Sequence, residues 1–292
     1  MKNFVIASIL FIILILAQPI QATGNFKIVS SFYPVYILAK NIAKDIPNVS
    51  VTNLTASFAT CLHDYTLTTS DLRKLSEADV LVINGLGMEN FILNVAKQYP
   101  KLKIIDLSKN VEVIKEKSDV NPHIWLSLKN TEKEIDTLTT NLSTIDPKNK
   151  IFYLNNAKKY KHKVESLDQR MILTLKPFND HFFLSFSDLF LYLAKDLKFK
   201  NLETPYAGHE TTPSPKDLRS IIDLIKKNKI KFIFADKNKS DYETAKLIAA
   251  ETKIKIYFLD PALYGSDNLN SYLEIMEQNL KTLLKAYTGN DK

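Results

Sequence analysis

The sequence predicts an α/β protein with two lobes, each built on a parallel sheet, joined by one long helix. Three observations lead to this fold class. Residues 148–176 contain neither glycine nor proline, and apolar residues recur there at spacings of three and four, which is typical of an amphipathic helix. Pro147 and Pro177 flank the segment, at positions that helices tolerate. On both sides, short apolar runs alternate with amphipathic segments, as in α/β domains.

The predicted long helix separates the chain into parts. Its apolar face comprises Leu154, Ala157, Tyr160, Val164, Leu167, Met171 and Leu175. A helix over 148–176 would be roughly 43 Å long at ~1.5 Å per residue, which exceeds the radius of a small domain. We therefore expect a first lobe at 23–147, the linking helix at 148–176 and a second lobe at 177–292. The alternative is one helix packed on a single large domain.

The N-terminus has the pattern of a signal peptide over residues 1–22. Lys2 precedes an apolar run at 4–17, and Ala22 provides a small residue for cleavage. The run is shorter than the ~20 residues that a membrane span needs. We expect cleavage after Ala22 and export to the periplasm, with an uncleaved anchor as the alternative. The single cysteine, Cys61, is far from this point, so we expect neither lipid attachment there nor an internal disulfide.

The charge of the chain argues against a nucleic-acid partner. The net charge is +7, but 36 of the 39 basic residues are lysines scattered along the sequence. No run of basic and aromatic residues suggests a groove for DNA or RNA. We interpret the lysines as the solvated faces of helices.

Two histidines of the first lobe lie in loops where α/β sheets build their sites. Strands are expected at 26–30, 49–54, 80–84 and 104–107, and helices at 33–43, 70–77 and 91–98, the second capped by Thr69 or Ser70. His63 lies between a strand and a helix, where the carboxyl ends of strands form binding sites, and His123 follows Pro122 in a later loop. A lone histidine is more often structural, but two in polar loops of one lobe favour a metal site. The turn at 85–87 is not a dinucleotide fingerprint, because Asn90 stands where a third glycine belongs.

The surroundings of these histidines resemble a known family. The stretch HDYTLTTSDLRKLSEADVLVINGLGMENF, which begins at His63, resembles the first ligand motif of the zinc- and manganese-binding solute-binding proteins of bacterial ABC transporters, and NPHIWLS around His123 resembles the second. The resemblance extends from about residue 26 to the C-terminal helix. It implies two α/β lobes joined by one long helix, in agreement with the periodicity. The family's His-rich loop is missing between Leu107 and His123.

The second lobe departs from the family pattern at one ligand. Strands are expected at 181–187, 231–235 and 254–259, and helices at 188–198, from Ser214 onward, at 240–251 and at 269–286. The resemblance implies a third ligand, His or Glu, at the position of Ser187, and a hydroxyl is a poor ligand for a transition metal. His181 cannot replace it directly, because it lies roughly 20 Å away along a strand at ~3.3 Å per residue.

The family's fourth ligand corresponds to Asp260 in a Leu-Asp-Pro motif. An aspartate before proline could equally cap a turn. The expected metal ligands are therefore His63, His123 and Asp260, with Ser187 at the doubtful position. Further candidates for the open position are water, Asp188, Cys61, and His209 or Glu210 in a later loop.

The predicted function is binding and delivery of a metal. Two imidazoles and a carboxylate suit Zn²⁺, and an added oxygen ligand favours Mn²⁺ or Fe²⁺. The resemblance implies a monomeric extracytoplasmic solute-binding protein, not an enzyme, that captures Zn²⁺, or next Mn²⁺, between its lobes and delivers it to an ABC permease.

Two other classes of protein remain as alternatives. One is a surface adhesin-like relative with weakened metal binding, which the loss of a ligand at Ser187 favours. The other is a secreted metal-dependent hydrolase, because a catalytic zinc also has an open coordination position. A hydrolase needs a general base beside the metal, and the sequence contains no HExxH-type helix.

Overall fold

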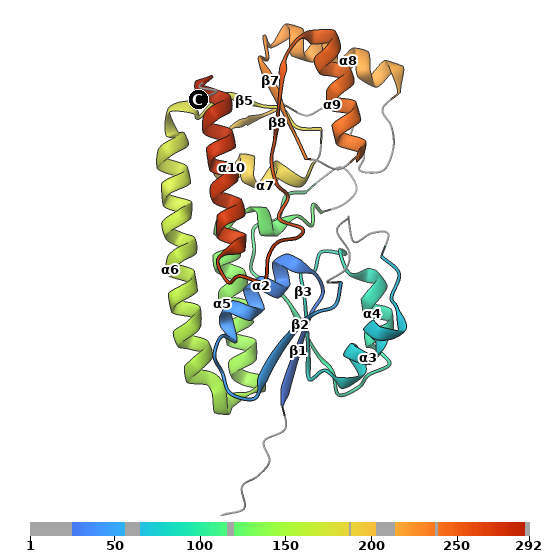
Figure 1. Cartoon of the computed structure of the whole chain (residues 1–292), viewed down its shortest axis with the longest axis vertical. Coiled ribbons are helices and arrows are strands. Elements are labelled where there is room, and N and C mark those ends of the chain that lie inside the picture. Colours follow the sequence, from blue (N-terminus) through green and yellow to red (C-terminus); the bar gives the residue numbers. More distant parts are fainter. Residues whose placement is uncertain are drawn as a thin grey trace, which may run out of the picture.

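The computed structural model describes residues 25–55, 65–115, 120–186, 188–202, 214–236 and 239–289, with the backbone alone at 239–241. Figure 1 shows two α/β lobes beside a layer of long helices that runs along both of them. The predicted signal peptide lies outside the described residues. Within the described part, none of the helices is both long and apolar enough to cross a membrane.

The first lobe contains a parallel sheet of four strands in the order β2-β1-β3-β4. These strands are β1 (Phe26–Ser30), β2 (Val49–Asn53), β3 (Val80–Ile83) and β4 (Lys103–Asp106). Alternate residues of β3 face opposite sides of the sheet, as the pleat requires. Val80 and Val82 join the main core, whereas Leu81 and Ile83 pack in a second cluster. Helix α2 (Tyr33–Ile42) lies on the first face, and α3 (Thr69–Glu77) and α4 (Asn90–Ala96) cover the second.

The second lobe repeats this strand order, with shorter strands at β5 and β6. Strand β5 (Phe182–Phe183) pairs with β6 (Lys200–Asn201), and β7 (Phe232–Ala235) pairs with β8 (Lys255–Phe258), all in parallel. A parallel bridge between Ser185 and Phe234 connects the two pairs, which gives the order β6-β5-β7-β8. Helices α7 (Leu191–Asp196), α8 (Pro215–Lys227) and α9 (Lys239–Thr252) complete the lobe, and a 3₁₀ turn, η5 (Asp188–Phe190), precedes α7.

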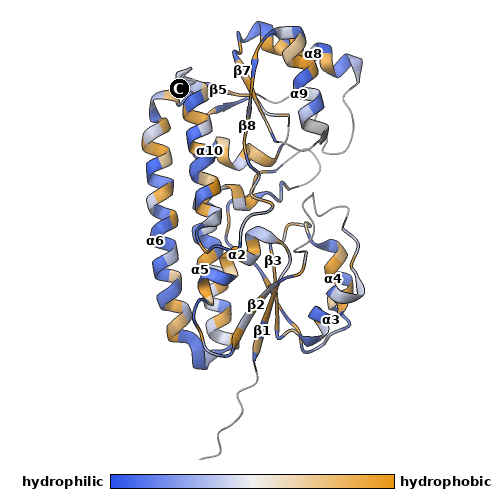
Figure 2. Ribbon diagram, in the orientation of Figure 1, coloured by the Kyte–Doolittle hydropathy of each residue, from blue (hydrophilic) through white to orange (hydrophobic). Residues whose placement is uncertain are grey.

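Three long helices form the layer beside the lobes. They are α5 (Leu128–Ile145), α6 (Lys150–Leu175) and α10 (Ser271–Thr288), and α6 packs on both of the others. Their shared core continues without interruption from Ile28 in the first sheet, through Val164 in α6, to Phe234 in the second sheet. Figure 2 shows that α6 alternates between hydrophobic and hydrophilic residues along its length, as expected for a half-buried helix.

The buried face of α6 differs from the prediction at one residue. Leu154 is 44% exposed, whereas the neighbouring Tyr153 is fully buried. The hydroxyl of Tyr153 donates a hydrogen bond of 2.8 Å to Asp146, so the tyrosine is satisfied inside the core. Since successive helical residues are rotated by about 100°, Leu154 cannot share this face with Tyr153, and the prediction for Leu154 was wrong.

Several element predictions need correction as well. Neither α5 nor β6 was predicted. The strand expected at 181–187 is reduced to Phe182–Phe183 and an isolated bridge at Ser185. The cap of α3 is Thr68, whose hydroxyl accepts from the backbone N–H of Asp71, and not Thr69 or Ser70. The helix expected from Ser214 onward is α8, and Ser214 is its N-cap.

Candidate metal site

The predicted ligands follow the carboxyl ends of strands in both lobes. His63 follows β2, the position of Ser187 follows β5, and Asp260 follows β8. In each sheet the strand order reverses beside the first strand, and parallel sheets bind ligands at the carboxyl ends near such a switch point. His63 and Ser187 themselves lie outside the described residues, as do Cys61, His209 and Glu210.

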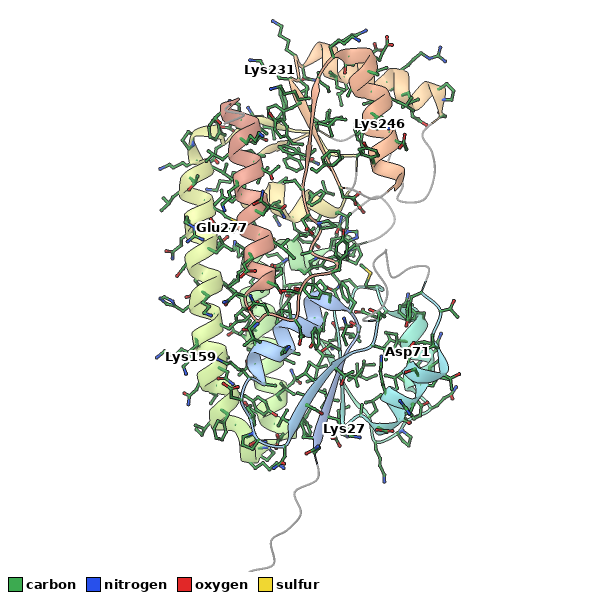
Figure 3. The ribbon with its side chains drawn as sticks, in the orientation of Figure 1. Lys27, Asp71, Lys159, Lys231, Lys246 and Glu277 are labelled. Atoms are coloured by element: carbon green, nitrogen blue, oxygen red, sulfur yellow. The ribbon has the colours of Figure 1, made fainter. Side chains whose placement is uncertain are left out.

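The chain two residues after His63 is anchored to the start of α3. The hydroxyl of Tyr65 donates a hydrogen bond of 2.7 Å to Asp71, which also accepts from the backbone N–H and the hydroxyl of Thr68 at 2.9 and 2.7 Å. Burial alone would raise the pKa of Asp71, but these hydrogen bonds lower it below its usual value. Asp71, labelled in Figure 3, is therefore a charged group that holds Tyr65 and Thr68, which follow His63 in the chain.

His123 is buried in the loop between β4 and α5, with 1% of its surface exposed. Its backbone N–H and its ring Nδ1 lie 2.9 and 3.0 Å from the side-chain oxygen of Asn121. Nδ1 also lies 3.8 Å from the Oδ1 atom of Asp188, which belongs to the second lobe. The imidazole packs edge-on against Trp125, with ring centroids 5.3 Å apart. This ring is held in one orientation by a hydrogen bond and by packing.

The loop of His123 is held from both lobes. In the first lobe, the side-chain amide of Asn84 donates to the carbonyl of Pro122 at 2.9 Å. In the second lobe, the hydroxyl of Tyr192 donates to the carbonyl of Asn121 at 2.8 Å. The sequence did not indicate a role for Asn121 or for Tyr192. The one signal that could have pointed to Asn121 was its place as the first residue of the NPHIWLS motif.

A buried glutamate supports the turn that carries Asn84. Glu89 accepts hydrogen bonds from the hydroxyl of Ser31 at 2.8 Å and from the backbone N–H groups of Asn84 and Gly85 at 2.7 and 3.0 Å. Burial raises the pKa of Glu89 to about 7 although these bonds oppose the shift. Gly85 has a φ of +91°, and a Cβ there would lie 2.1 Å from a carboxylate oxygen of Asp106. Glycine is thus required at this turn.

Asp260 lies in a turn that contacts the loop of His123. The indole N–H of Trp125 donates to the carbonyl of Pro261 at 2.8 Å. One carboxylate oxygen of Asp260 accepts from the backbone N–H of Ala262 at 2.8 Å, which is the turn-capping role that the sequence left open. The side chain of Asn279 in α10 pairs with the backbone N–H and carbonyl of Asp260, both at 2.8 Å. The fold therefore brings the His123 and Asp260 segments together.

The described residues by themselves do not complete a metal centre. Among them, no group of three or more His, Cys, Asp or Glu side chains is placed to hold a metal ion. The sequence also did not single out Asp236, a buried acid directly after β7. A site with the predicted ligands would thus require the segments of His63 and Ser187 together with His123 and Asp260.

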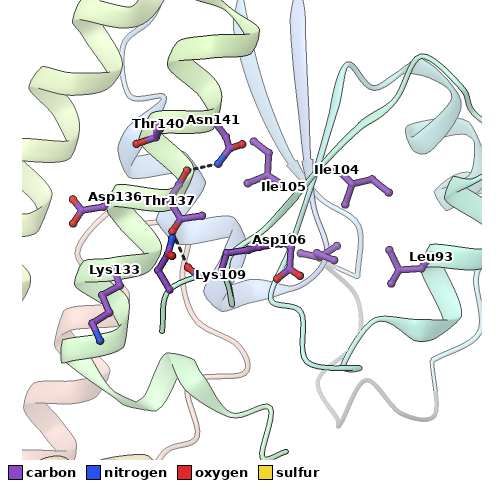
Figure 4. Close-up of a pocket in the computed structure, with 12 residues that line it drawn as sticks. Leu93, Ile104, Ile105, Asp106, Lys109, Lys133, Asp136, Thr137, Thr140 and Asn141 are labelled. Carbon is purple, nitrogen blue, oxygen red and sulfur yellow. Dashed lines mark hydrogen bonds between the residues drawn. The ribbon is translucent and has the colours of Figure 1, made fainter. Parts of the chain in front are cut away.

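A pocket of about 640 Å³ lies elsewhere on the first lobe, between β4 and α5. Figure 4 shows Ile104, Ile105 and Asp106 on one side of it and Lys133 and Thr137 on the other. None of the predicted ligands lines this pocket. It is separate from the candidate metal site.

Comparison with known proteins gives a family match over most of the chain. The model of the family described as "Zinc-uptake complex component A periplasmic" (ZnuA) matches residues 28–286. The zinc-binding lipoprotein AdcA of Streptococcus pneumoniae is 28% identical over 284 residues, which cover 90% of this chain and 56% of the relative. This chain therefore spans about half the length of that relative.

Two further similar proteins are matched over most of their length. The iron-binding protein YfeA of Yersinia pestis is 26% identical over 281 residues, which cover 92% of this chain and 89% of YfeA. The solved structure of a manganese-bound periplasmic metal-binding protein from Candidatus Liberibacter asiaticus superposes with a TM-score of 0.78 at 28% identity, covering 89% of this chain and 98% of that one. These matches confirm the expected fold class.

Proposed function

This chain belongs to the family of periplasmic zinc-uptake components, and from that premise we propose that it is an extracytoplasmic solute-binding protein for a divalent transition metal. In this proposal the metal is cargo, bound between the lobes and handed to the permease of an ABC transporter. The chain acts as a monomer and catalyses no reaction. Residues 1–22 direct export and are removed, and the lobes at 23–147 and 177–292 are joined by the helix at 148–176.

One observation carries the proposal: a buried imidazole is held between the two lobes, at the carboxyl ends of their strands. His123 of the first lobe lies beside Asp188 of the second, and its neighbour Trp125 donates to the carbonyl after Asp260. An imidazole and a carboxylate from different lobes are ligand types that a metal can join across a cleft. We propose His63, His123 and Asp260 as ligands.

The fourth position and the metal follow from ligand chemistry. Ser187 stands where the family has its third ligand, and a serine hydroxyl is a weak ligand for a transition metal. The remaining coordination position could therefore be filled by water, Ser187, Asp188 or a group from the loop with His209 and Glu210. Two nitrogens and one carboxylate favour Zn²⁺, and Mn²⁺ follows if the remaining ligands are oxygens. The matched relatives are named as zinc-binding and iron-binding proteins, so similarity to them does not identify the metal.

The test is calorimetric titration of the metal-free protein with Zn²⁺ and Mn²⁺, for the parent, His63→Ala and His123→Ala. Loss of an outer-shell partner typically lowers metal affinity roughly 10–100-fold. Each ligand variant should lower the affinity by more than this. His162→Ala is the matched control, because His162 is exposed on the outer side of α6, and it should bind like the parent. Unchanged affinity in both ligand variants would refute the assigned site, and a parent that binds no metal would favour the adhesin-like alternative.

A further inference from the structure

We propose that Asn121 is a positioning residue that selects the tautomer of His123 and couples its ring to the second lobe. The proposal rests on the proposed function, in which His123 binds the metal. It concerns the side chain of Asn121, which contacts Asp188, and the backbone carbonyl of Asn121, which contacts Tyr192. Asn121 and His123 are each 1% exposed, so bulk water does not compete for their hydrogen bonds.

The orientation of the Asn121 amide is determined by two contacts that do not involve the imidazole. The backbone N–H of His123 can only donate, and it lies 2.9 Å from the Oδ1 atom of Asn121. The backbone carbonyl of Asp188 can only accept, and it lies 3.0 Å from the Nδ2 atom. Reversing the amide would therefore place two donors together at one end and two acceptors at the other.

This orientation assigns the proton of the neutral imidazole. The Oδ1 atom of Asn121 is an acceptor only, so the Nδ1 atom of His123, at 3.0 Å, must donate to it. The carboxylate oxygen of Asp188, 3.8 Å from Nδ1, favours a proton on the same nitrogen. Because neutral imidazole carries one proton, the lone pair lies on Nε2. Asn121 thus prepares Nε2 as the metal-binding atom before the metal arrives.

Asn121 also connects this ring to the second lobe. The side-chain amide of Asn121 donates to the backbone carbonyl of Asp188 in η5. The backbone carbonyl of Asn121 accepts from the hydroxyl of Tyr192 in α7. Asp188 directly follows Ser187 in the sequence, the position of the family's third ligand. Outer-shell partners of this kind orient a ligand and tune its basicity. The geometry therefore links the first-lobe ligand to the segment expected to supply the next one.

The experiment measures the ring ¹⁵N chemical shifts of His123 by NMR in the metal-free protein, and zinc affinity by competition titration. In Asn121→Leu, whose side chain has the same branching but is larger and has no acceptor, the Nδ1–H tautomer should lose its dominance and zinc affinity should fall roughly 10–100-fold. Asn121→Ala serves the same purpose if the leucine variant does not fold. Asn121→Asp keeps an acceptor for the ring but loses the donor to Asp188, and it should retain the Nδ1–H tautomer.

Tyr192→Phe is the matched control. It removes the hydroxyl that donates to the backbone carbonyl of Asn121 at 2.8 Å and accepts from the backbone N–H of Ile114 at 3.0 Å. The contact between Asn121 Oδ1 and the imidazole stays in place, so the tautomer should remain as in the parent. If Asn121→Leu or Asn121→Ala keeps both the parent tautomer and the parent affinity while His123→Ala loses zinc, the positioning role is refuted and the proposed function stands. If the parent itself binds neither zinc nor manganese, the proposed function fails, whatever tautomer the variants show.

Discussion

Ser187 is the residue that distinguishes this chain from the ligand motif it resembles. A serine hydroxyl binds divalent transition metals weakly, and the residue after it, Asp188, already approaches His123 with its carboxylate. Two arrangements therefore compete. Either the third-ligand position is vacant, or another side chain fills it.

Replacing Ser187 by histidine should decide between these arrangements. If the position is vacant, Ser187→His completes a set of three imidazoles and one carboxylate, and zinc affinity should rise more than manganese affinity because imidazole suits zinc better. If the position is filled, the added ring crowds it and affinity stays level or falls. Parallel titrations of the variant and the parent with both metals provide the measurement; a gain that is absent or equal for both metals would count against the vacancy.

Glu134 in α5 is an acid that the proposed function does not use. It is fully buried, and burial raises its pKa from the ordinary 4.5 to about 8. Burial also raises the pKa of Tyr160 in α6, and a charge on Glu134 raises it further. The folded protein therefore holds a proton on Glu134 at pH values where the unfolded chain has released it.

The pH dependence of stability follows from this shift. Between about pH 4.5 and 8 the folded state binds the extra proton, so the Glu134 contribution to the free energy of unfolding falls as the pH rises. Glu134→Gln, which stays neutral, should gain stability relative to the parent from pH 5 to pH 8, on the order of 3 kcal/mol. Denaturant unfolding at both pH values measures this gain. Glu251→Gln, at an exposed position in α9, is the control, and an equal gain there would contradict the assignment to Glu134.

At the scale of elements, α5 and α6 show two different relations between sequence and structure. The buried residues of α6, from Tyr153 to Leu175, keep spacings of three and four, so its periodicity alone identifies the helix. Helix α5 contains five threonines and two asparagines, which have weak helix propensity. It persists because Leu128, Ile135, Leu138 and Leu142 pack in the main core. Its Ser127 cap, whose hydroxyl accepts from the backbone N–H of Asn130, adds to this packing.

At the scale of the whole molecule, the two lobes are separate sheets on one continuous core. The core cluster contains residues of both sheets and of α5, α6 and α10. Smaller clusters occur only on the far faces of the sheets within the described residues. A hinge between the lobes would have to disrupt this core, so we expect the lobes to unfold together.

Leu167→Ala tests this cooperativity. Leu167 is 3% exposed in α6, and removing it from the core should lower the free energy of unfolding by roughly 2–5 kcal/mol. Fluorescence of the single tryptophan, Trp125, which lies in the interlobe region, should report the same transition as far-UV circular dichroism. Leu173→Ala in the same helix, at a site 69% exposed, should change little. Separate midpoints from the two probes would show that the lobes unfold independently.

The sequence by itself determined the features that depend on neighbouring residues. Periodicity identified α6, and short apolar runs identified the four strands of the first sheet and the α/β class, because both patterns are local in the sequence. The motifs around His123 and Asp260 placed these residues in loops at strand ends. Only the tertiary structure decided that Tyr153, and not Leu154, completes the core, that α5 is a helix, and that Asn121, Tyr192 and Asp188 meet at the loop of His123. Those outcomes depend on contacts between segments far apart in the chain, whose partners are fixed only when the sheets and helices pack together.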